Sequence, residues 1–149
     1  MNNQILGFFG QYRFLSNFHE HEGMIIYIDG FAGQKIACNS VEHAFQASKT
    51  FDIAQRTAVA NAETPGKAKK EGRKVDLRPD WEEVKNDVML ELLVQKFTNP
   101  YYKELLLATG DDYLEETNTW NDVWFGVCNG IGKNYLGKML MEIREALHR

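Results

Sequence analysis

The stretch DWEEVKNDVMLELLVQKF, residues 80–97, has the pattern of a helix that begins at a cap. Asp80 can accept the first backbone N–H groups, and Glu83 follows three residues later, where a second capping carboxylate belongs. Behind this cap, core-facing side chains recur every three or four residues, which is the helical period. They are Trp81, Val84, Val88, Leu92, Leu93, Gln95 and Phe97. The pattern predicts a helix with Trp81 as an anchor in the core.

Similar start signals lie on both sides of this stretch. A capping side chain precedes each predicted helix, and in two cases proline follows at the first helical position. These starts are Asn39 or Ser40, Thr64-Pro65, Asn99-Pro100 and Asn134. Gly110 closes the third helix, and the last carries an apolar face through residues 136–147. Most of the chain after Asn39 is therefore predicted to be helical.

The strand signals lie nearer the N-terminus. Residues 24–28 and 31–38 flank Asp29-Gly30, a tight-turn pair, which predicts a β-hairpin. Residues 5–9 are predicted to be a short strand, and residues 11–23 have no clear period and are predicted to be a loop. Strands and helices do not alternate, which disfavours a parallel doubly wound sheet. The predicted fold class is α+β and helix-dominated, with a small N-terminal hairpin or sheet packed on several helices.

Length and composition bound the class of protein. The 149 residues, 44% of them hydrophobic, suit a single domain over residues 1–149, since no linker or repeat divides them. The net charge of −4 disfavours a general nucleic-acid or membrane-surface binder. Cys38 and Cys128 lie far apart, which disfavours a disulfide framework or a thiolate metal site. No secretory signal or bilayer-spanning run occurs, so a cytoplasmic protein is expected.

Residues 120–134 combine two indoles, an acid and three glycines. Flat side chains and a backbone without Cβ atoms suit a pocket for a base or sugar whose phosphates approach backbone N–H groups. Neither a dinucleotide fingerprint nor a Walker loop is complete, because Tyr135 and Asn134 stand at the deciding positions. Asp122 beside Trp124 is a candidate catalytic acid, and an aspartate that caps the turn is the competing explanation.

The predicted helix after Ser40 places Glu42, Gln46 and Lys49 on one face, apart from its apolar face. Glu42 falls in the first turn, where the helix dipole favours an ionised carboxylate. Such a carboxylate can stabilise positive charge on a sugar ring or orient water. The competing explanation is a glutamate that serves the dipole among solvated neighbours, and the residue types alone favour it.

Each of three further features has a purely structural explanation beside the functional one. Asn17, in an aromatic loop, could bond a ribose hydroxyl or satisfy the turn. The basic run of residues 67–74 could attract a phosphate-bearing substrate or form a solvated helix face. His19 and His21 have the spacing of a metal-binding pair, but no third ligand follows, so surface histidines are expected.

Taken together, the segments resemble the NADAR family, also called YbiA-like. The resemblance covers nearly the whole chain, and its specificity lies in the order and intervals of pieces that are each weak. The earlier pieces are Leu15-Ser16-Asn17-Phe18, Ser40-Val41-Glu42-His43, Phe45-Gln46, Lys49 and Gly72-Arg73. The later pieces are Asp80-Trp81, Lys85, Val88-Met89, Lys96-Phe97, residues 106–110, Asp122, Trp124, residues 132–137 and residues 140–144.

The resemblance implies an activity and a set of site residues. Members of this family resemble N-glycosidases and cleave the bond between ribose C1′ and a nitrogen. Their known substrates are phosphoribosylated intermediates of riboflavin synthesis and, in other branches, ADP-ribose on nucleic-acid bases. By position, Glu42 becomes the leading catalytic carboxylate, with Asp122 assisting, and both are expected to face one cleft. The substrate-binding candidates are Arg13, Asn17, Lys49, Lys69, Arg73, Trp81, Trp124, Gly132 and Asn134.

The resemblance also implies a hydrolase without a cofactor or metal, since water can attack an oxocarbenium-like centre without a Lewis acid. Its expected partner is a small phosphoribosyl or ADP-ribosyl molecule, with a modified nucleic acid as the other candidate and no membrane. A non-catalytic module that binds ADP-ribose or a nucleotide is the alternative function. Phe125 departs from the family pattern, in which Trp runs directly into Gly, so the pocket wall after Trp124 and the substrate base stay open.

Overall fold

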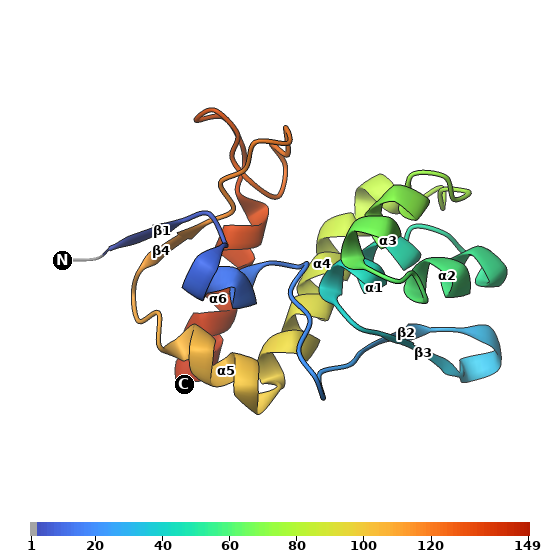
Figure 1. Ribbon diagram of the computed structural model, residues 1–149, viewed down its shortest axis with the longest axis horizontal. Coiled ribbons are helices and arrows are strands. Elements are labelled where there is room, and N and C mark those ends of the chain that lie inside the picture. Colours follow the sequence, from blue (N-terminus) through green and yellow to red (C-terminus); the bar gives the residue numbers. More distant parts are fainter. Residues whose placement is uncertain (1–2) are drawn as a thin grey trace. The chain divides into compact units, whose positions relative to one another are not determined.

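The computed structural model describes residues 3–149 and consists mainly of helices, with a few short strands (Figure 1). The helices are α1 (Val41–Ala47), α2 (Ile53–Ala60), α3 (Pro65–Gly72), α4 (Trp81–Thr98), α5 (Pro100–Leu107) and α6 (Tyr135–His148), with the 3-10 turns η1 (Gly10–Leu15) and η2 (Phe31–Gly33). The strands are β1 (Gln4–Leu6), β2 (Ile26–Asp29), β3 (Lys35–Cys38) and β4 (Tyr113–Glu115). The predicted fold class, helix-dominated α+β, is confirmed.

The chain forms two compact units. The central unit comprises residues 17–96, and the terminal unit comprises residues 3–16 together with residues 97–149. The single domain over residues 1–149 stays a prediction. Among residues 3–149, no helix is both long enough and apolar enough to cross a membrane.

In the central unit, β2 and β3 pair antiparallel, and Asp29 opposite Lys35 is the last pair. The predicted hairpin is therefore confirmed. The predicted tight turn at Asp29-Gly30 is wrong, because residues 30–34 connect the strands and include η2. This longer connection uses left-handed backbone at Ala32, with φ 53°. The Asp-Gly pair thus marks the end of the first strand and not the whole turn.

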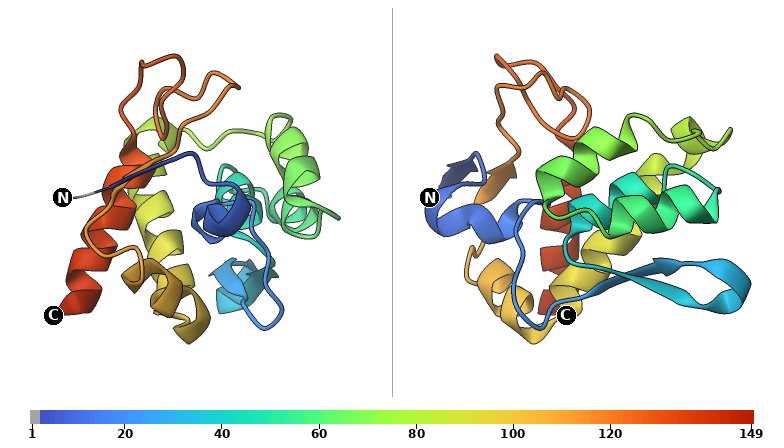
Figure 2. Two further views of the ribbon diagram at one scale, coloured as in Figure 1. Left: turned by 60° about the vertical axis from the view of Figure 1, so that its left-hand side comes forward. Right: turned by 45° about the vertical axis from the view of Figure 1, so that its right-hand side comes forward.

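Helix α1 packs against α2 and α3, and the hairpin contacts α1 and α2 (Figures 1 and 2). Local capping explains where two of these helices begin. Ser40 Oγ accepts the backbone N–H of His43 at 3.1 Å, and Thr64 Oγ1 accepts that of Lys67 at 3.1 Å. Both predicted caps are confirmed, as is the helix that begins at Trp81.

Helix α2 is not among the predicted helices. Its N-cap is Asp52, whose Oδ1 accepts the backbone N–H of Gln55 at 2.9 Å. Arg56, which α2 carries into the core, donates to the carbonyl oxygens of Thr50 and Asp29, each at 2.9 Å. The bond to Asp29 ties α2 to the hairpin, so a contact between distant residues stabilises a segment whose own pattern is weak.

In the terminal unit, β1 and β4 pair in parallel, with Ile5 opposite Leu114. The strand predicted over residues 5–9 is observed at Gln4–Leu6, and its partner β4 is not among the predicted strands. Part of the predicted loop over residues 11–23 is helical, because η1 ends at Leu15. Helix α5 begins as predicted and contacts both η1 and α6.

Asn134 occupies the N-cap position of α6 without capping it through its side chain. Its backbone is left-handed, with φ 54° and ψ 39°, and its side chain makes no bond to the first turn. Instead, Oδ1 accepts the backbone N–H of Glu116, and Nδ2 donates to the carbonyl oxygen of Leu114, each at 3.0 Å. The predicted side-chain cap is therefore wrong, because long-range bonds to the β4 segment replace the local one.

Candidate active site

Glu42 lies in the first turn of α1 and is buried, with 6% of its surface exposed. Gln46, one turn later, is equally buried and donates from Nε2 to Glu42 Oε2 at 2.9 Å. This bond confirms that the two residues share a helix face. The competing explanation required solvated neighbours, and Gln46 is not one. Burying a carboxylate without hydrogen-bond partners costs free energy. The bond from Gln46 offsets part of that cost, so Glu42 and Gln46 form a buried polar site.

Asn17 lies beside Glu42, since its backbone oxygen accepts the Glu42 N–H at 3.0 Å. The side-chain Nδ2 approaches the sulfur of Met89 at 3.5 Å. Asn17 Oδ1 is buried and has no hydrogen-bond partner among residues 3–149. A buried acceptor of this kind is uncommon in folded proteins and suits a donor supplied by water or a ligand. The structure thus brings two of the predicted site residues, Asn17 and Glu42, together.

Lys49 follows α1 and is half-buried. Burial lowers the pKa of Lys49, and the charge of Glu42 opposes this by raising it. The positive charges of Arg73, Lys69 and Lys85 lower the pKa of Lys49 further. Three predicted residues, Lys49, Lys69 and Arg73, therefore share one electrostatic environment with the Glu42 carboxylate.

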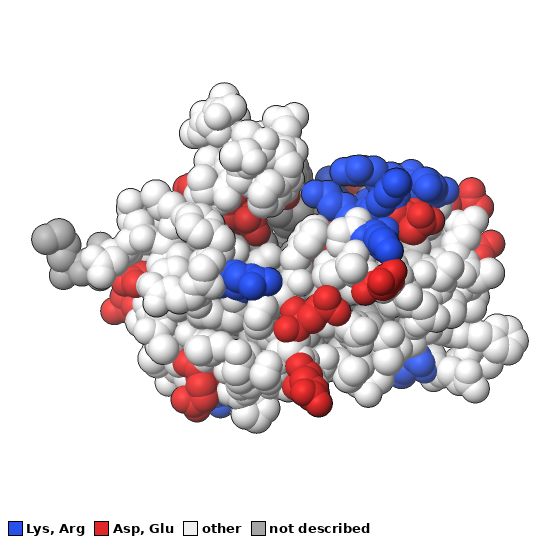
Figure 3. Space-filling view, in the orientation of Figure 1, with Lys and Arg blue, Asp and Glu red and all other residues white. Residues whose placement is uncertain are grey.

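Figure 3 shows Lys and Arg side chains gathered over α3. Ion pairs at the two ends of α3 neutralise part of this basic surface. Lys67 Nζ lies 2.6 Å from Glu63 Oε2, and Lys74 Nζ lies 3.4 Å from Glu71 Oε1. Lys69 lies over the ring of Phe18, with Nζ 5.8 Å from the ring centre. The surface therefore combines a solvated helix face with the cations that act on Lys49.

Trp81, at the start of α4, is 5% exposed. Its ring packs against Phe45 of α1, with centroids 5.0 Å apart at a tilt of 55°. This contact confirms the expected core anchor. A stacking role for Trp81 against substrate stays a prediction.

In the terminal unit, Asp122 holds a turn. Its Oδ1 accepts the backbone N–H groups of Trp124 and Phe125 at 3.1 and 3.0 Å. Asn118 brackets the same residue, because its Nδ2 donates to the Asp122 carbonyl oxygen at 2.8 Å and its Oδ1 accepts the Asp122 N–H at 3.0 Å. These bonds are those of the competing explanation, a turn-capping aspartate. A catalytic role for Asp122 stays a prediction.

The glycines of this loop allow two backbone segments to approach closely. A Cβ at Gly132 would overlap the carbonyl oxygen of Gly126 and lie 2.9 Å from Val127 Cα. A Cβ at Gly126 would overlap the carbonyl oxygen of Glu116. Packing therefore accounts for both glycines, and the expected contact between Gly132 and a phosphate stays a prediction.

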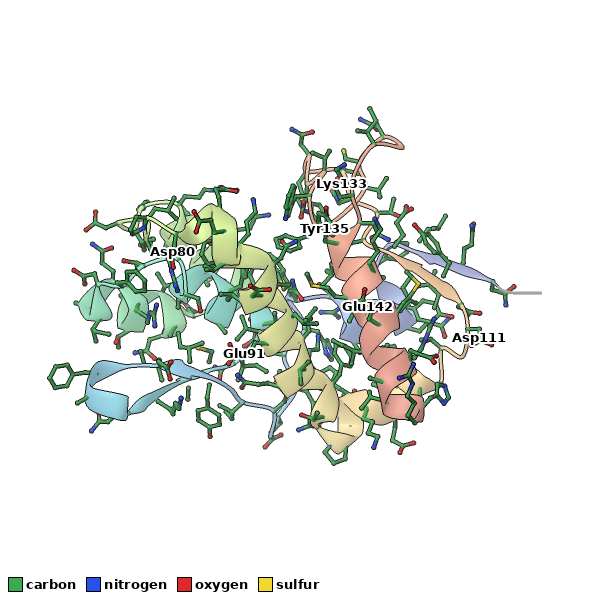
Figure 4. The ribbon with its side chains drawn as sticks, turned by 180° about the vertical axis from the view of Figure 1, so that it is seen from behind. Asp80, Glu91, Asp111, Lys133, Tyr135 and Glu142 are labelled. Carbon is green, nitrogen blue, oxygen red and sulfur yellow. The ribbon has the colours of Figure 1, made fainter. Side chains whose placement is uncertain are left out.

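Trp124 is 37% exposed and its ring packs at 4.9 Å from that of Tyr135. Figure 4 shows Tyr135 and Lys133 where this loop enters α6. Asn134 between them is 2% exposed, and its side chain is bonded to the β4 segment. Arg13 is exposed in η1 of the same unit. The terminal unit thus holds Arg13, Asp122, Trp124, Gly132 and Asn134, whereas Glu42 belongs to the central unit, and their shared cleft stays a prediction.

Two residues of the Glu42 environment carry no predicted role. Gln46 could have been found from its i, i+4 spacing to Glu42. Lys85 acts on Lys49 from α4, and no local pattern signals this. Within residues 3–149, no three His, Cys, Asp or Glu side chains gather as a metal site would require. His19 and His21 are half-buried.

The fold and this site define a small, helix-dominated α+β protein with a buried carboxylate set among cations. The chain belongs to the NADAR family, since the NADAR domain matches residues 7–148. It is 39% identical to N-glycosidase Npun_R5314 of Nostoc punctiforme over 114 residues, which cover 72% of this chain and 73% of that protein. It is 42% identical to N-glycosidase YbiA of Escherichia coli over 110 residues, which cover 71% and 68%.

Two further comparisons extend this relationship. The solution NMR structure of E. coli YbiA superimposes with a TM-score of 0.79 at 35% identity, over 99% of this chain and 87% of that one. The maize riboflavin biosynthesis protein PYRR, chloroplastic, is 32% identical over 145 residues, which cover 89% of this chain and 23% of that protein.

Proposed function

We propose that this chain hydrolyses the bond between ribose C1′ and a nitrogen in a phosphoribosylated or ADP-ribosylated substrate. The enzyme class, a hydrolase of N-glycosyl bonds, is the one that its relatives' names carry. The observation that supports a site in this chain is the burial of Glu42 with a hydrogen bond from Gln46. A carboxylate held in this way suits a reaction that develops positive charge.

The reaction itself assigns the role of Glu42. As the C1′–N bond breaks, its electron pair moves to the nitrogen of the leaving base, and positive charge builds on the ribose ring. Ionised Glu42 stabilises that charge and accepts a proton from the attacking water, whose oxygen forms the new bond to C1′. The proton then passes to the leaving nitrogen, and the ribose keeps a hydroxyl at C1′.

The cations around this carboxylate favour a substrate that carries phosphate. Lys69 and Arg73 act on Lys49 together with Glu42, so one region offers both a catalytic anion and cations for phosphate oxygens. Asn17, with its buried and unpartnered oxygen, is the candidate acceptor for a ribose hydroxyl. Arg13, Trp81, Trp124, Gly132 and Asn134 remain proposed contacts, with Asp122 as a second carboxylate.

The test is incubation with two substrate types, a phosphoribosylated amine of the riboflavin pathway and an ADP-ribosylated base in DNA, with mass detection of the freed base and sugar. We expect Glu42→Gln to lower kcat by about 10²–10⁴-fold, the range of positioned acid–base groups. Glu104→Gln makes the same change at an exposed position of α5 and should keep full activity.

Equal rates of base release by Glu42→Gln and the wild type would show that Glu42 is not a catalytic residue. A ligand that raises the melting temperature but releases no base would instead identify a binding module, and Glu42→Gln would then leave affinity largely intact.

A further inference from the structure

Gly72, the last residue of α3, is buried against the side chain of Gln46. A Cβ at position 72 would overlap Gln46 Oε1 and lie 2.9 Å from both Cβ and Cδ of the same residue. Cβ atoms in real proteins essentially never come within 3.0 Å of another atom, so any side chain at position 72 forces Gln46 to move.

The backbone does not require glycine at this position. Gly72 is helical and is not among the glycines with positive φ, so an alanine would fit its conformation. Glycine in a helix is normally disfavoured relative to alanine. The space taken by Gln46 is therefore the reason that the structure gives for glycine here.

The side-chain amide of Gln46 lies between Glu42 and Gly72. Nε2 donates to Glu42 Oε2, and Oε1 lies against Gly72 without a hydrogen-bond partner among residues 3–149. Glycine at position 72 leaves the space that the Gln46 amide occupies while it donates to Glu42. A buried oxygen without a hydrogen bond lowers the stability of the folded protein.

We infer that Gly72 is a positioning residue for the proposed hydrolysis: its bare Cα leaves room for Gln46, and the Gln46 amide donates to Glu42 and favours the ionised carboxylate. The inference rests on the proposed function for its catalytic consequence, whereas the seating of Gln46 is independent of any activity. The charged groups around Glu42 are Lys49 after α1, Lys69 of α3, Arg73 at its C-cap and Lys85 of α4. The Gly72→Ala substitution replaces none of these four side chains.

The first test measures the pKa of the Glu42 carboxyl by carbon-detected NMR titration, with the signal assigned by its loss in Glu42→Gln. Gly72→Ala should displace the Gln46 donor and raise this pKa by about one unit, the size of a lost hydrogen bond to a charged group. Gly66→Ala is the matched control in α3, because a Cβ there meets its nearest atom, Thr64 Oγ1, only at 3.9 Å. An unchanged pKa in Gly72→Ala overturns the inference.

The second test separates seating from general packing. Gly72→Ala should lower kcat/KM by about tenfold or more in the wild type, and should cause no further loss in a Gln46→Gly background, where the overlapping side chain is absent. An equal loss in both backgrounds would mean that Gly72 acts through other contacts and would overturn the inference.

If Gly72→Ala does not fold, the Gln46→Gly/Gly72→Ala pair decides the matter. Recovery of folding in the pair supports the seat, and failure of the pair beside a folded Gln46→Gly opposes it. Absence of base release from the wild-type protein would refute the proposed function alone, since the titration of Glu42 still reports on Gly72.

Discussion

The side-chain oxygen of Asn134 accepts a hydrogen bond from the backbone N–H of Glu116 at 3.0 Å, although 18 residues separate them in the chain. The amide nitrogen of Asn134 donates to Leu114 at the same distance. A residue at the start of α6 therefore satisfies the main chain of β4 and of the residue that follows it. Because these groups are buried, leaving one unpaired costs about 1–3 kcal/mol.

We expect Asn134→Gly to lower the free energy of unfolding by about 2–4 kcal/mol. Glycine keeps the left-handed backbone, so the variant removes only the side-chain bonds. Asn129→Gly is the control, because Asn129 is also left-handed, with φ 53°, and is exposed. Urea denaturation measures both variants, and similar midpoints would contradict a structural role for the Asn134 amide.

Gly132→Ala should destabilise the fold more than Gly130→Ala. Both positions have positive φ, which costs alanine about 1–2 kcal/mol. Only at Gly132 does the new methyl group overlap backbone atoms, which adds about 1–3 kcal/mol of overpacking. Thermal unfolding should give a clearly lower melting temperature for Gly132→Ala. Equal melting temperatures for the two variants would show that the loop makes room for the new methyl group at position 132 without loss of stability.

The stability of the protein should depend on Cys38 above neutral pH. Burial raises the pKa of the Cys38 thiol from 9.0 to about 12, and the charge of Arg56 opposes this shift. The unfolded chain releases this proton near pH 9, whereas the folded protein keeps it. The contribution is therefore fully present below about pH 9 and is lost as pH rises toward 12, by at most about 1.4 kcal/mol per pH unit.

Urea denaturation of the wild type and Cys38→Ala measures this dependence at about pH 8, below the window, and at about pH 9.5 and 10.5 within it. Every other titrating group is common to both proteins, so the difference between the curves isolates Cys38. We expect the wild type to lose stability more steeply with pH. Parallel curves would mean that the thiol titrates normally in the folded state.

Glu42→Gln should lower the pKa of Lys49, because it removes a negative charge that favours the protonated amine. The Glu42 charge raises this pKa, while burial and the neighbouring cations lower it, so its removal leaves only the lowering influences. NMR titration of the isotopically dimethylated lysine reports the change without any substrate. Glu104→Gln, at an exposed position of α5, should leave the Lys49 titration where it is. If the pKa of Lys49 is the same in Glu42→Gln and in the wild type, the two side chains do not interact.

Much of the fold could be predicted because a few neighbouring residues determine where most of these helices begin. Ser40, Thr64 and Asn99 each bond to a backbone N–H two or three residues ahead, so a short pattern is sufficient. Asn134 has the same residue type in the same position, but its partners lie some 20 residues earlier, and no local rule finds them. Strand β4 was missed for the same reason, since its partner is at the other end of the chain.

The candidate site divides in the same way. The helical period placed Glu42 and Gln46 on one face, and their hydrogen bond confirms it. Burial of that face could not be read from polar residue types, because it depends on how α3 packs against α1. The influence of the Lys85 charge on the pKa of Lys49 depends on tertiary structure and has no sequence pattern.

The pairing of β1 with β4 has a consequence for how the chain is made. Residues 4–6 are synthesised before their partners at 113–115, which follow more than 100 residues later. The central unit, residues 17–96, is contiguous and emerges complete before that point. During synthesis β1 therefore cannot pair with β4 until all of residues 17–96, which include Glu42, have been made.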